Sequence, residues 1–350
     1  MARLLKIVVL AALVTGVVAL VAARRGHAAS PETNTQAAPA MSMTTAEHLA
    51  HLKMLSDAGD IHAGHALDEF ARGVAQAAPV NLKLPADDMG VVARLASSPR
   101  KGEYVNVMVD GKPMRTWVVH PAGNGKAPVV VVIMEIFGLS DWIRGVADQL
   151  AAEGFIAVAP DIVVGHGKDG GDTSSLSTQQ EITSAVVSIP GAERTAKLRA
   201  AREWALKDPR SNGKSASVGF CFGGSESFSL AVAEPGLNAA VVYCGTAPTD
   251  APPAQRGAPP TPYQVSDKVA NVKAPIIGFY GGLMQDPRVG NTVAPTEEKM
   301  KALGKTYDPH IFDGAAHGFL RAQTGNDGAN MKATEQAWPM TIAWLKKYTS

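Results

Sequence analysis

Cysteine is scarce in this chain, with only Cys221 and Cys244 among 350 residues. So few cysteines exclude a small disulfide-stapled scaffold. An excess of one sign of charge is lacking too, because 33 Lys and Arg residues nearly balance 32 Asp and Glu residues and leave a formal net charge of +1. With no basic block in the sequence, there is no electrostatic reason to expect a nucleic-acid partner. The function must therefore be sought in individual motifs.

Hydrophobic residues make up 46% of the chain, which is enough for a sizeable core and excludes global disorder. Near the start, two basic residues precede an uninterrupted apolar run over residues 7–23, and two arginines and the small residues of "GHAAS" follow it. This order is typical of a secretory signal. We therefore expect residues 1–29 to be a signal peptide cleaved near Ala28 or Ala29, giving a periplasmic or secreted protein. The alternative is an uncleaved anchor that tethers the protein to the membrane, facing the periplasm.

Residues 30–99 are expected to form a linker and a helical extension. The linker, residues 30–40, is rich in Pro, Ala, Thr and Asn. Residues 44–77 carry apolar residues at helical spacing. Two pairs of histidines in this segment lie three residues apart, His48 with His51 and His62 with His65. Such pairs could hold a metal, but no cysteine or carboxylate completes a ligand set, so we favour solvated helix faces and expect no metal.

From about residue 100 the chain alternates between strands and helices. Two alternating segments around a turn at "GKP" predict a β-hairpin, and the apolar run "APVVVVIMEIFG" predicts a strand buried on both faces. Expected strands span residues 103–110, 115–121, 127–138, 155–161, 215–220, 237–245, 274–282 and 306–312. Expected helices span residues 141–154, 191–209, 223–236, 295–303 and 329–348. This order predicts an α/β fold over residues 100–350, with helices on both sides of a mostly parallel sheet. Residues 162–190 are expected to be a lid or a substrate-facing loop.

One cysteine lies in an unusual setting, the stretch "SVGFCFGGSES". Cys221 is flanked by Gly219 and Gly223 between an expected strand and an expected helix. Either the sulfur is buried at a tight turn, or it is a nucleophile held at a nucleophile elbow, where small residues two positions away avoid a collision. A thiolate is a strong nucleophile at neutral pH, and the start of a helix favours the anion.

Partners for such a nucleophile follow further along the chain. Asp286 comes just after an expected strand and His317 just after the last one. In a fold with a nucleophile elbow, the nucleophile, the acid and the histidine follow one another in this order. The histidine takes the proton of the nucleophile and the carboxylate fixes its tautomer. The sequence therefore predicts a catalytic triad of Cys221, His317 and Asp286.

The segments "MEIFG", "GFCFGG", "DPRV" and "HGFLR" together resemble the dienelactone hydrolase family (carboxymethylenebutenolidases), a Cys-His-Asp branch of the α/β-hydrolases. The resemblance covers about residues 100–350. It implies that Glu135 lies beside the resting thiol of Cys221 and helps to activate it. It also implies an oxyanion hole formed by the backbone N–H groups of Ile136 and Phe222, and a substrate carboxylate bound by Arg321. No metal or organic cofactor is implied.

The sequence also departs from the family pattern. A second substrate-binding arginine is missing after "APD", where Lys168 or His166 could substitute for it, and "YGGLMQDPRV" is two residues longer than usual. These departures leave the substrate open. Cys244 ends the strand expected beside that of Cys221, so it is either a buried cysteine or the partner of a disulfide that silences the enzyme.

The resulting hypothesis is an exported hydrolase that cleaves a small-molecule ester or lactone through a covalent thioester on Cys221. A general carboxylesterase or thioesterase on the same triad is the alternative within enzymes. The alternative outside enzymes is a periplasmic binding protein that has lost activity on a hydrolase fold.

Overall fold

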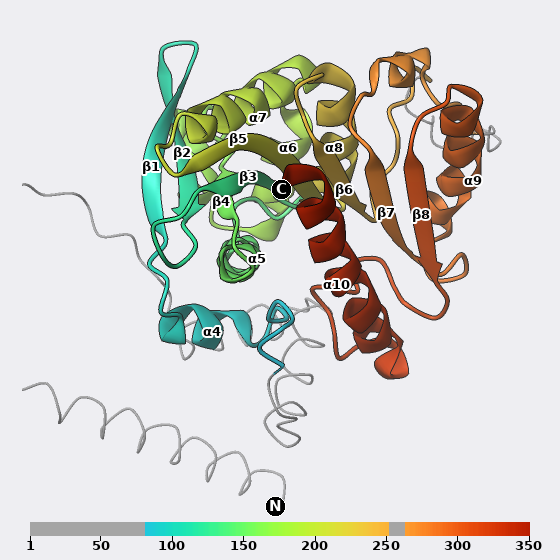
Figure 1. The fold of residues 1–350 in the computed structure, drawn as a ribbon, viewed down its shortest axis with the longest axis horizontal. Coiled ribbons are helices and arrows are strands. Elements are labelled where there is room, and N and C mark those ends of the chain that lie inside the picture. The colour runs from blue at the N-terminus through green and yellow to red at the C-terminus, as the bar shows by residue number, and fades with distance from the viewer. Residues whose placement is uncertain (1–80, 252–262) are drawn as a thin grey trace, which may run out of the picture. The chain divides into compact units, whose positions relative to one another are not determined.

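The computed structural model describes residues 81–251 and 263–350, which belong to one compact unit (Figure 1). The expected signal peptide or anchor over residues 1–29, the linker over 30–40 and the helical segment over 44–77 with its four histidines lie outside the described residues. Among the helices that are described, none is long and apolar enough to span a membrane.

A single eight-stranded sheet runs through the described residues, in the order β1-β2-β4-β3-β5-β6-β7-β8. Its first two strands form the expected antiparallel hairpin, β2 is antiparallel to β4, and the remaining neighbours are parallel. The predicted α/β fold with a mostly parallel sheet is confirmed. The strands are β1 (Glu103–Val109), β2 (Lys112–Val119), β3 (Ala127–Ile133), β4 (Ile156–Pro160), β5 (Ser211–Phe220), β6 (Ala239–Tyr243), β7 (Ile276–Gly281) and β8 (Tyr307–Phe312).

Burial along the strands explains their composition. Every residue of β4, β6 and β7 is buried, and β3 is buried except for one half-buried position. Strands covered on both faces need no polar side, which is why these segments are continuous apolar runs. The edge strand β1 instead mixes exposed and buried positions. The core of the protein is therefore centred on the parallel part of the sheet.

Helices cover both faces of this sheet. Figure 1 shows α7 and α8 on one side and α5 and α10 on the other. The α-helices of the described residues are α4 (Val91–Ser97), α5 (Asp141–Ala152), α6 (Gln179–Ser188), α7 (Gly191–Leu206), α8 (Phe222–Ala233), α9 (Pro287–Ala302) and α10 (Ala329–Thr349). The short 3-10 helices are η1 (Lys168–Gly170), η2 (Thr173–Ser175), η3 (Asp267–Asn271) and η4 (Asn326–Gly328).

Two expectations for local structure were wrong. Residues 162–190, expected as a loop, contain α6, whose start is fixed by a capping box between Thr178 and Glu181. The helix expected at residue 295 begins at Pro287, because a proline suits the first turn of a helix, where its missing N–H is not needed. Pro295 then lies inside α9 and does not begin it.

The described part of the expected extension, residues 81–99, packs on the α/β fold. Leu84 and Val91 are 4% and 2% exposed and join the main core. A Cβ atom on Gly145 of α5 would lie 2.2 Å from Val91, so this glycine admits α4 against α5. The Gln323 side chain donates a hydrogen bond to the carbonyl of Pro85 at 2.9 Å. Residues 81–97 are thus fixed to the loop that follows His317.

Candidate active site

Cys221 lies at the expected turn between β5 and α8, with φ 55° and ψ −113°. A positive φ is uncommon for a residue other than glycine and marks local strain. The surroundings hold this conformation: the Cys221 N–H donates to the Tyr243 carbonyl at 2.8 Å, and the Cys221 carbonyl accepts from the Gly224 N–H at 3.0 Å. The turn is therefore fixed between β6 and the first turn of α8.

The glycines around Cys221 allow a close approach of main chains. A Cβ atom on Gly219 would lie 1.8 Å from the carbonyl oxygen of Gly223. One on Gly223 would lie 2.3 Å from the carbonyl oxygen of Ile133, at the end of β3. Distances this short are not tolerated between backbone atoms and a side chain, so the Gly-x-Cys-x-Gly pattern follows from the geometry of the elbow.

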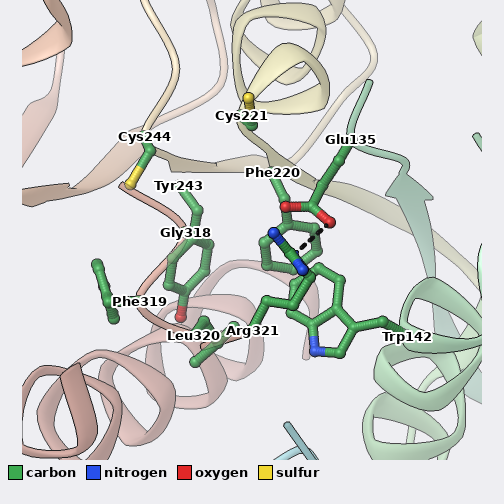
Figure 2. Close-up of a pocket in the computed structure, with 10 residues that line it drawn as sticks. All are labelled: Glu135, Trp142, Phe220, Cys221, Tyr243, Cys244, Gly318, Phe319, Leu320 and Arg321. Carbon is green, nitrogen blue, oxygen red and sulfur yellow. Dashed lines mark ion pairs between the residues drawn. The ribbon is translucent and has the colours of Figure 1, made fainter. Parts of the chain in front are cut away.

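Strand register brings Glu135 to the same edge of the sheet as Cys221. Ile133 of β3 pairs with Gly219 of β5. Glu135 and Cys221 each follow their paired residue by two positions, so they lie at the same level of the sheet. Figure 2 shows both residues at one pocket. The pocket is lined by Glu135, Trp142, Phe220, Cys221, Tyr243, Cys244, Gly318, Phe319, Leu320 and Arg321.

Aromatic rings form one wall of this pocket. Trp142 meets Phe220 edge to face at 4.9 Å between ring centroids, and Phe220 stacks on Tyr243 at 5.1 Å. The Tyr243 hydroxyl is hydrogen-bonded to the Thr341 hydroxyl at 2.6 Å, which satisfies its buried polar group. The pocket therefore offers apolar surface next to a few charged groups.

Glu135 is almost fully buried, with 3% of its surface exposed. Burial raises the pKa of this carboxyl group to about 7, against the opposing effect of the Arg321 charge. Its Oε2 atom forms an ion pair with the Nε atom of Arg321 at 3.2 Å, drawn as a dashed line in Figure 2. A carboxyl group in this environment exchanges a proton near neutral pH.

Arg321 binds a second carboxylate as well. Its Nη1 group donates to Oδ2 of Asp88 at 2.7 Å. The guanidinium group also lies over the Phe137 ring, 4.9 Å from its centroid. Asp88 is a residue of the site that the sequence analysis missed, because no motif surrounds it.

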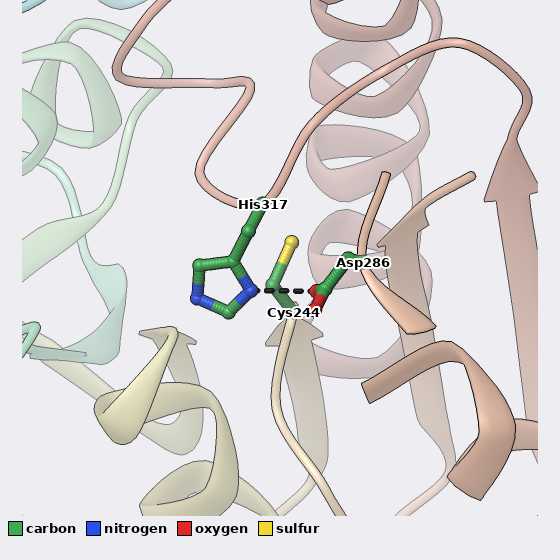
Figure 3. A group of neighbouring side chains, drawn as sticks. All are labelled: Cys244, Asp286 and His317. Atoms are coloured by element: carbon green, nitrogen blue, oxygen red, sulfur yellow. Dashed lines mark hydrogen bonds and ion pairs between the residues drawn. The ribbon is translucent and has the colours of Figure 1, made fainter. Parts of the chain in front are cut away.

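His317 and Asp286 are brought together as expected, with Nδ1 of the histidine 2.6 Å from Oδ2 of the aspartate (Figure 3). Burial alone would lower the pKa of His317, but hydrogen bonds with Asp286 and Cys221 raise that pKa to about 9. Burial would raise the pKa of Asp286, but the hydrogen bond and the charge of His317 hold it below its usual value. The structure thus pairs His317 with Asp286 and brings the Cys221 thiol close enough to affect the pKa of His317.

Cys244 lies behind this chain, at the end of β6. Its thiol is within 4.8 Å of ligand atoms of Asp286 and His317, a spacing at which the three side chains could share a metal ion (Figure 3). Two of those ligand atoms are already joined by the hydrogen bond between Asp286 and His317. Both cysteines are free thiols, and their sulfur atoms point in different directions in Figure 2.

The predicted oxyanion donors each follow a residue that lines the pocket, Ile136 after Glu135 and Phe222 after Cys221. Phe222 is the first residue of α8, so its backbone N–H has no acceptor within the helix. Ile136 follows Glu135 in the turn after β3, where the Gly138 N–H donates to the Glu135 carbonyl at 3.3 Å. Their role as donors stays a prediction.

The two suggested substitutes for a second arginine do not line the pocket. His166 is bound to Glu193, with 2.8 Å between Nε2 and Oε1. Lys168 lies in the exposed η1. The structure thus places Arg321 at the pocket without a second cation from either residue.

Chemically, a thiol beside an imidazole that is bonded to a carboxylate can attack a carbonyl carbon.

Comparison with known proteins gives the same family as the motifs. The family model described as "Dienelactone hydrolase family" matches residues 114–349. A protein of Methylorubrum extorquens named "Putative carboxymethylenebutenolidase" is 30% identical over 256 residues, which cover 71% of this chain and 81% of that protein. A protein of the same name from Escherichia coli K12 is 27% identical over 280 residues, which cover 80% of this chain and 95% of that protein.

Solved structures support the fold. A crystal structure titled as a "Putative Dienelactone Hydrolase" from Klebsiella pneumoniae has a TM-score of 0.60 at 23% identity and covers 71% of this chain and 99% of its own. A dienelactone hydrolase-like promiscuous phosphotriesterase from metagenomic libraries has a TM-score of 0.56 at 20% identity, with 72% and 99% covered. With a family match over residues 114–349 and these relatives, the chain belongs to the dienelactone hydrolase family of α/β-hydrolases and is an enzyme of the carboxylic ester hydrolase class.

Proposed function

We propose that this protein hydrolyses an ester or lactone bond of a small molecule through a covalent thioester on Cys221. The observation that carries the proposal is the hydrogen bond of 2.6 Å between Nδ1 of His317 and Oδ2 of Asp286, together with the effect of the nearby Cys221 thiol on the pKa of His317. Cys221 is the nucleophile, His317 moves the proton, and Asp286 orients the imidazole.

In the first step, the Cys221 sulfur attacks the carbonyl carbon of the substrate. The bond between that carbon and the alkoxy oxygen then breaks, and His317 gives its proton to the departing oxygen. The acyl group is left as a thioester on Cys221. In a lactone, the alcohol formed in this way stays attached to the acyl group, because both were part of one ring.

In the second step, water attacks the thioester while His317 accepts a proton from it. The carbon–sulfur bond breaks, the carboxylic acid leaves, the imidazolium is restored, and the thiolate takes back its proton from Glu135. Both steps pass through a tetrahedral oxyanion, for which preorganised N–H donors are needed. We assign this task to the backbone N–H groups of Ile136 and Phe222.

Glu135 supports the resting state of the site. A carboxyl group with a pKa of about 7 can accept the thiol proton of Cys221 once its side chain turns from Arg321 toward the sulfur. Its ion pair with Arg321 keeps its side chain oriented in the pocket. We therefore assign to Glu135 the activation of the thiol.

The substrate class follows from the relatives and from the pocket. The name carboxymethylenebutenolidase, given to relatives from several bacteria, describes a lactone hydrolase. The space beside Cys221 is lined mainly by apolar side chains, which favours an apolar group next to the reacting carbonyl. A general carboxylesterase or thioesterase would use the same triad, and a panel of lactones, linear esters and thioesters separates these activities.

The test compares wild type with Cys221→Ser and His317→Ala on that panel, and uses mass spectrometry to look for an acyl adduct on Cys221. We expect turnover and an adduct in wild type, and at least about a hundredfold loss of turnover in His317→Ala. Equal turnover by all three proteins would overturn the triad. A folded wild type without turnover or adduct would favour a binding protein.

We further infer that the protein is exported. The support is the order of basic, apolar and small residues over residues 1–29. The test is the N-terminal mass of protein recovered from the periplasm of an expressing bacterium. A mature chain that begins after Ala28 or Ala29 indicates cleavage, a full-length chain in the membrane fraction indicates an anchor, and cytoplasmic full-length protein overturns the inference.

A further inference from the structure

Arg321 at the pocket is shared between two carboxylates of the protein itself. Nε lies 3.2 Å from Glu135, and Nη1 donates to Asp88 at 2.7 Å. One face of the guanidinium group covers the Phe137 ring. A substrate carboxylate would require the same planar fork of donors that these groups occupy.

Asp88 is held in place by more than its ion pair. Its backbone N–H donates to the carbonyl of Arg321 at 3.0 Å, so the two residues are joined through main chain and side chain. Leu84 and Val91, on either side of it in sequence, are buried in the core. The carboxylate is therefore carried on an ordered segment and not on a free end.

The segment that carries Asp88 precedes the match to the family model, although the alignment with the Escherichia coli K12 protein, over 80% of this chain, includes it. The family model matches residues 114–349, and Asp88 precedes that range. The contact between Asp88 and Arg321 spans 233 positions of sequence. The charge of Arg321 is thus balanced in part by a residue far from it in sequence.

The charges also matter for an incoming anion. With Glu135 and Asp88 ionised, two negative charges surround the single positive charge of Arg321. A third carboxylate must either displace Asp88 or approach a group of net negative charge, and like charges at close range cost free energy. An uncharged acyl group meets neither obstacle.

We propose that Asp88 is a specificity-determining residue: it occupies Arg321 in place of a substrate carboxylate, so that the site selects esters or lactones whose acyl part is uncharged. The inference rests on the proposed ester hydrolysis and narrows its substrate class. Asp88 acts through Arg321 and does not touch the reacting atoms.

The test uses two substrates that differ in one group. The 4-nitrophenyl ester of hexanoic acid ends in a methyl group, and the mono-4-nitrophenyl ester of adipic acid has a carboxylate at that position. The measured quantity is the ratio of kcat/KM for the adipate ester to kcat/KM for the hexanoate ester, in wild type, Asp88→Asn and Asp267→Asn. Asp267 is the control, because its carboxylate also pairs with a cation but that cation is Lys299 and not Arg321.

Asp88→Asn should raise this ratio about threefold to fivefold, as expected for releasing a half-exposed ion pair. The control should leave the ratio unchanged. The gain should shrink at high salt, since the pair is partly screened by solvent. A ratio that stays the same in Asp88→Asn, or that changes equally in Asp267→Asn, overturns the inference. A merely structural role of Asp88 would lower both rates together and leave the ratio constant.

A binding experiment keeps this result separate from the fate of the proposed function. If wild type hydrolyses neither ester, the proposed function fails. Titration calorimetry on the Cys221→Ser protein then tests whether Asp88 disfavours the binding of a carboxylate. The ligands are hexanoate and hexanamide. Asp88→Asn on that background should favour hexanoate over hexanamide about threefold to fivefold more than the parent protein does. The same preference in both proteins overturns the inference.

Discussion

Cys221 and Cys244 end neighbouring parallel strands and have nearly the same φ angle, yet their surroundings differ. Their φ angles are 55° and 49°, and Phe220 of β5 pairs with Tyr243 of β6 just before them. Cys221 is half-buried and lines the pocket, and its thiol helps to raise the pKa of His317. Cys244 is buried, and burial raises the pKa of its thiol to about 12. The comparison teaches that the same backbone conformation can place one thiol at a pocket and bury another.

The difference arises from the segment of chain after each cysteine. After Cys221 the chain enters α8, so the thiol lies at the start of a helix, where an anion is favoured. After Cys244 the chain continues through Gly245, whose Cβ position would lie 2.3 Å from the main chain of Gly224. Cys244 therefore packs beneath the elbow, whereas Cys221 is placed on it.

Replacing the two thiols gives the largest contrast that we expect. Cys221→Ala should lower kcat/KM for an ester substrate by at least about a thousandfold, because the covalent intermediate cannot form. Cys244→Ala should lower it by less than about tenfold, since that sulfur only packs against the Asp286–His317 pair. Initial rates with a 4-nitrophenyl ester measure both. Losses of equal size would show that Cys244 takes part in the chemistry.

Alkylation tests the same contrast without a substrate. In the folded protein, iodoacetamide should modify Cys221 at least about a hundredfold faster than Cys244, because the thiolate is the reactive form and Cys244 is buried with a high pKa. Peptide mass spectrometry over a time course gives both rates. Unfolding in guanidinium is the control and should make the two rates similar. Comparable rates in the folded state would contradict the assigned environments.

Gly223, the second residue of α8, should matter for the stability of the fold. Gly223→Ala places a Cβ atom 2.3 Å from the Ile133 carbonyl oxygen, so the elbow beneath Cys221 must shift. We expect the free energy of unfolding to fall by about 3 kcal/mol or more, measured by urea denaturation. Gly125→Ala is the matched control, because its Cβ atom would meet open space. A loss of similar size in both variants would contradict the packing argument.

The smallest expected effect concerns pH and the charged group beside Cys221. Glu135 has a pKa of about 7 when folded, above its ordinary value of 4.5, so the folded protein binds more protons between these values. Stability should therefore fall as pH rises through this window, and Glu135→Gln should remove about 1–3 kcal/mol of that fall.

Urea denaturation at pH 4.5 and pH 8 measures this difference. Cys244→Ala is the control, because its thiol, with a pKa of about 12, does not titrate in the window and the variant should keep the wild-type slope. A Glu135→Gln profile parallel to that of wild type would contradict the burial of an ionisable carboxyl group at this position.

Much of the fold was predictable because buried parallel strands have a strong sequence signal. Continuous apolar runs such as that of β3 contain no polar side and are easily recognised. The elbow was predictable for the same local reason, since the close contact between Gly219 and Gly223 lies within a few residues of Cys221. The first residues of helices were harder to predict, because Pro295 lies inside α9 although a proline is typical of the first turn of a helix.

The site was predictable where strand ends determine it and not elsewhere. Asp286 and His317 follow strands, so their contact follows from the order of the sheet. Asp88 follows no strand and belongs to no motif, and its contact with Arg321 depends on how residues 81–97 pack on the domain. Contacts of this kind depend on tertiary packing, which a local pattern does not encode.

The packing of α4 has a practical consequence for expressing the protein in shortened form. A chain begun at residue 100, where the regular alternation of strands and helices starts, would lack Leu84 and Val91. The slot beside Gly145 that Val91 fills would then face water as bare apolar surface. Such a surface favours self-association. A soluble and monodisperse preparation should therefore keep the residues from 81 onward.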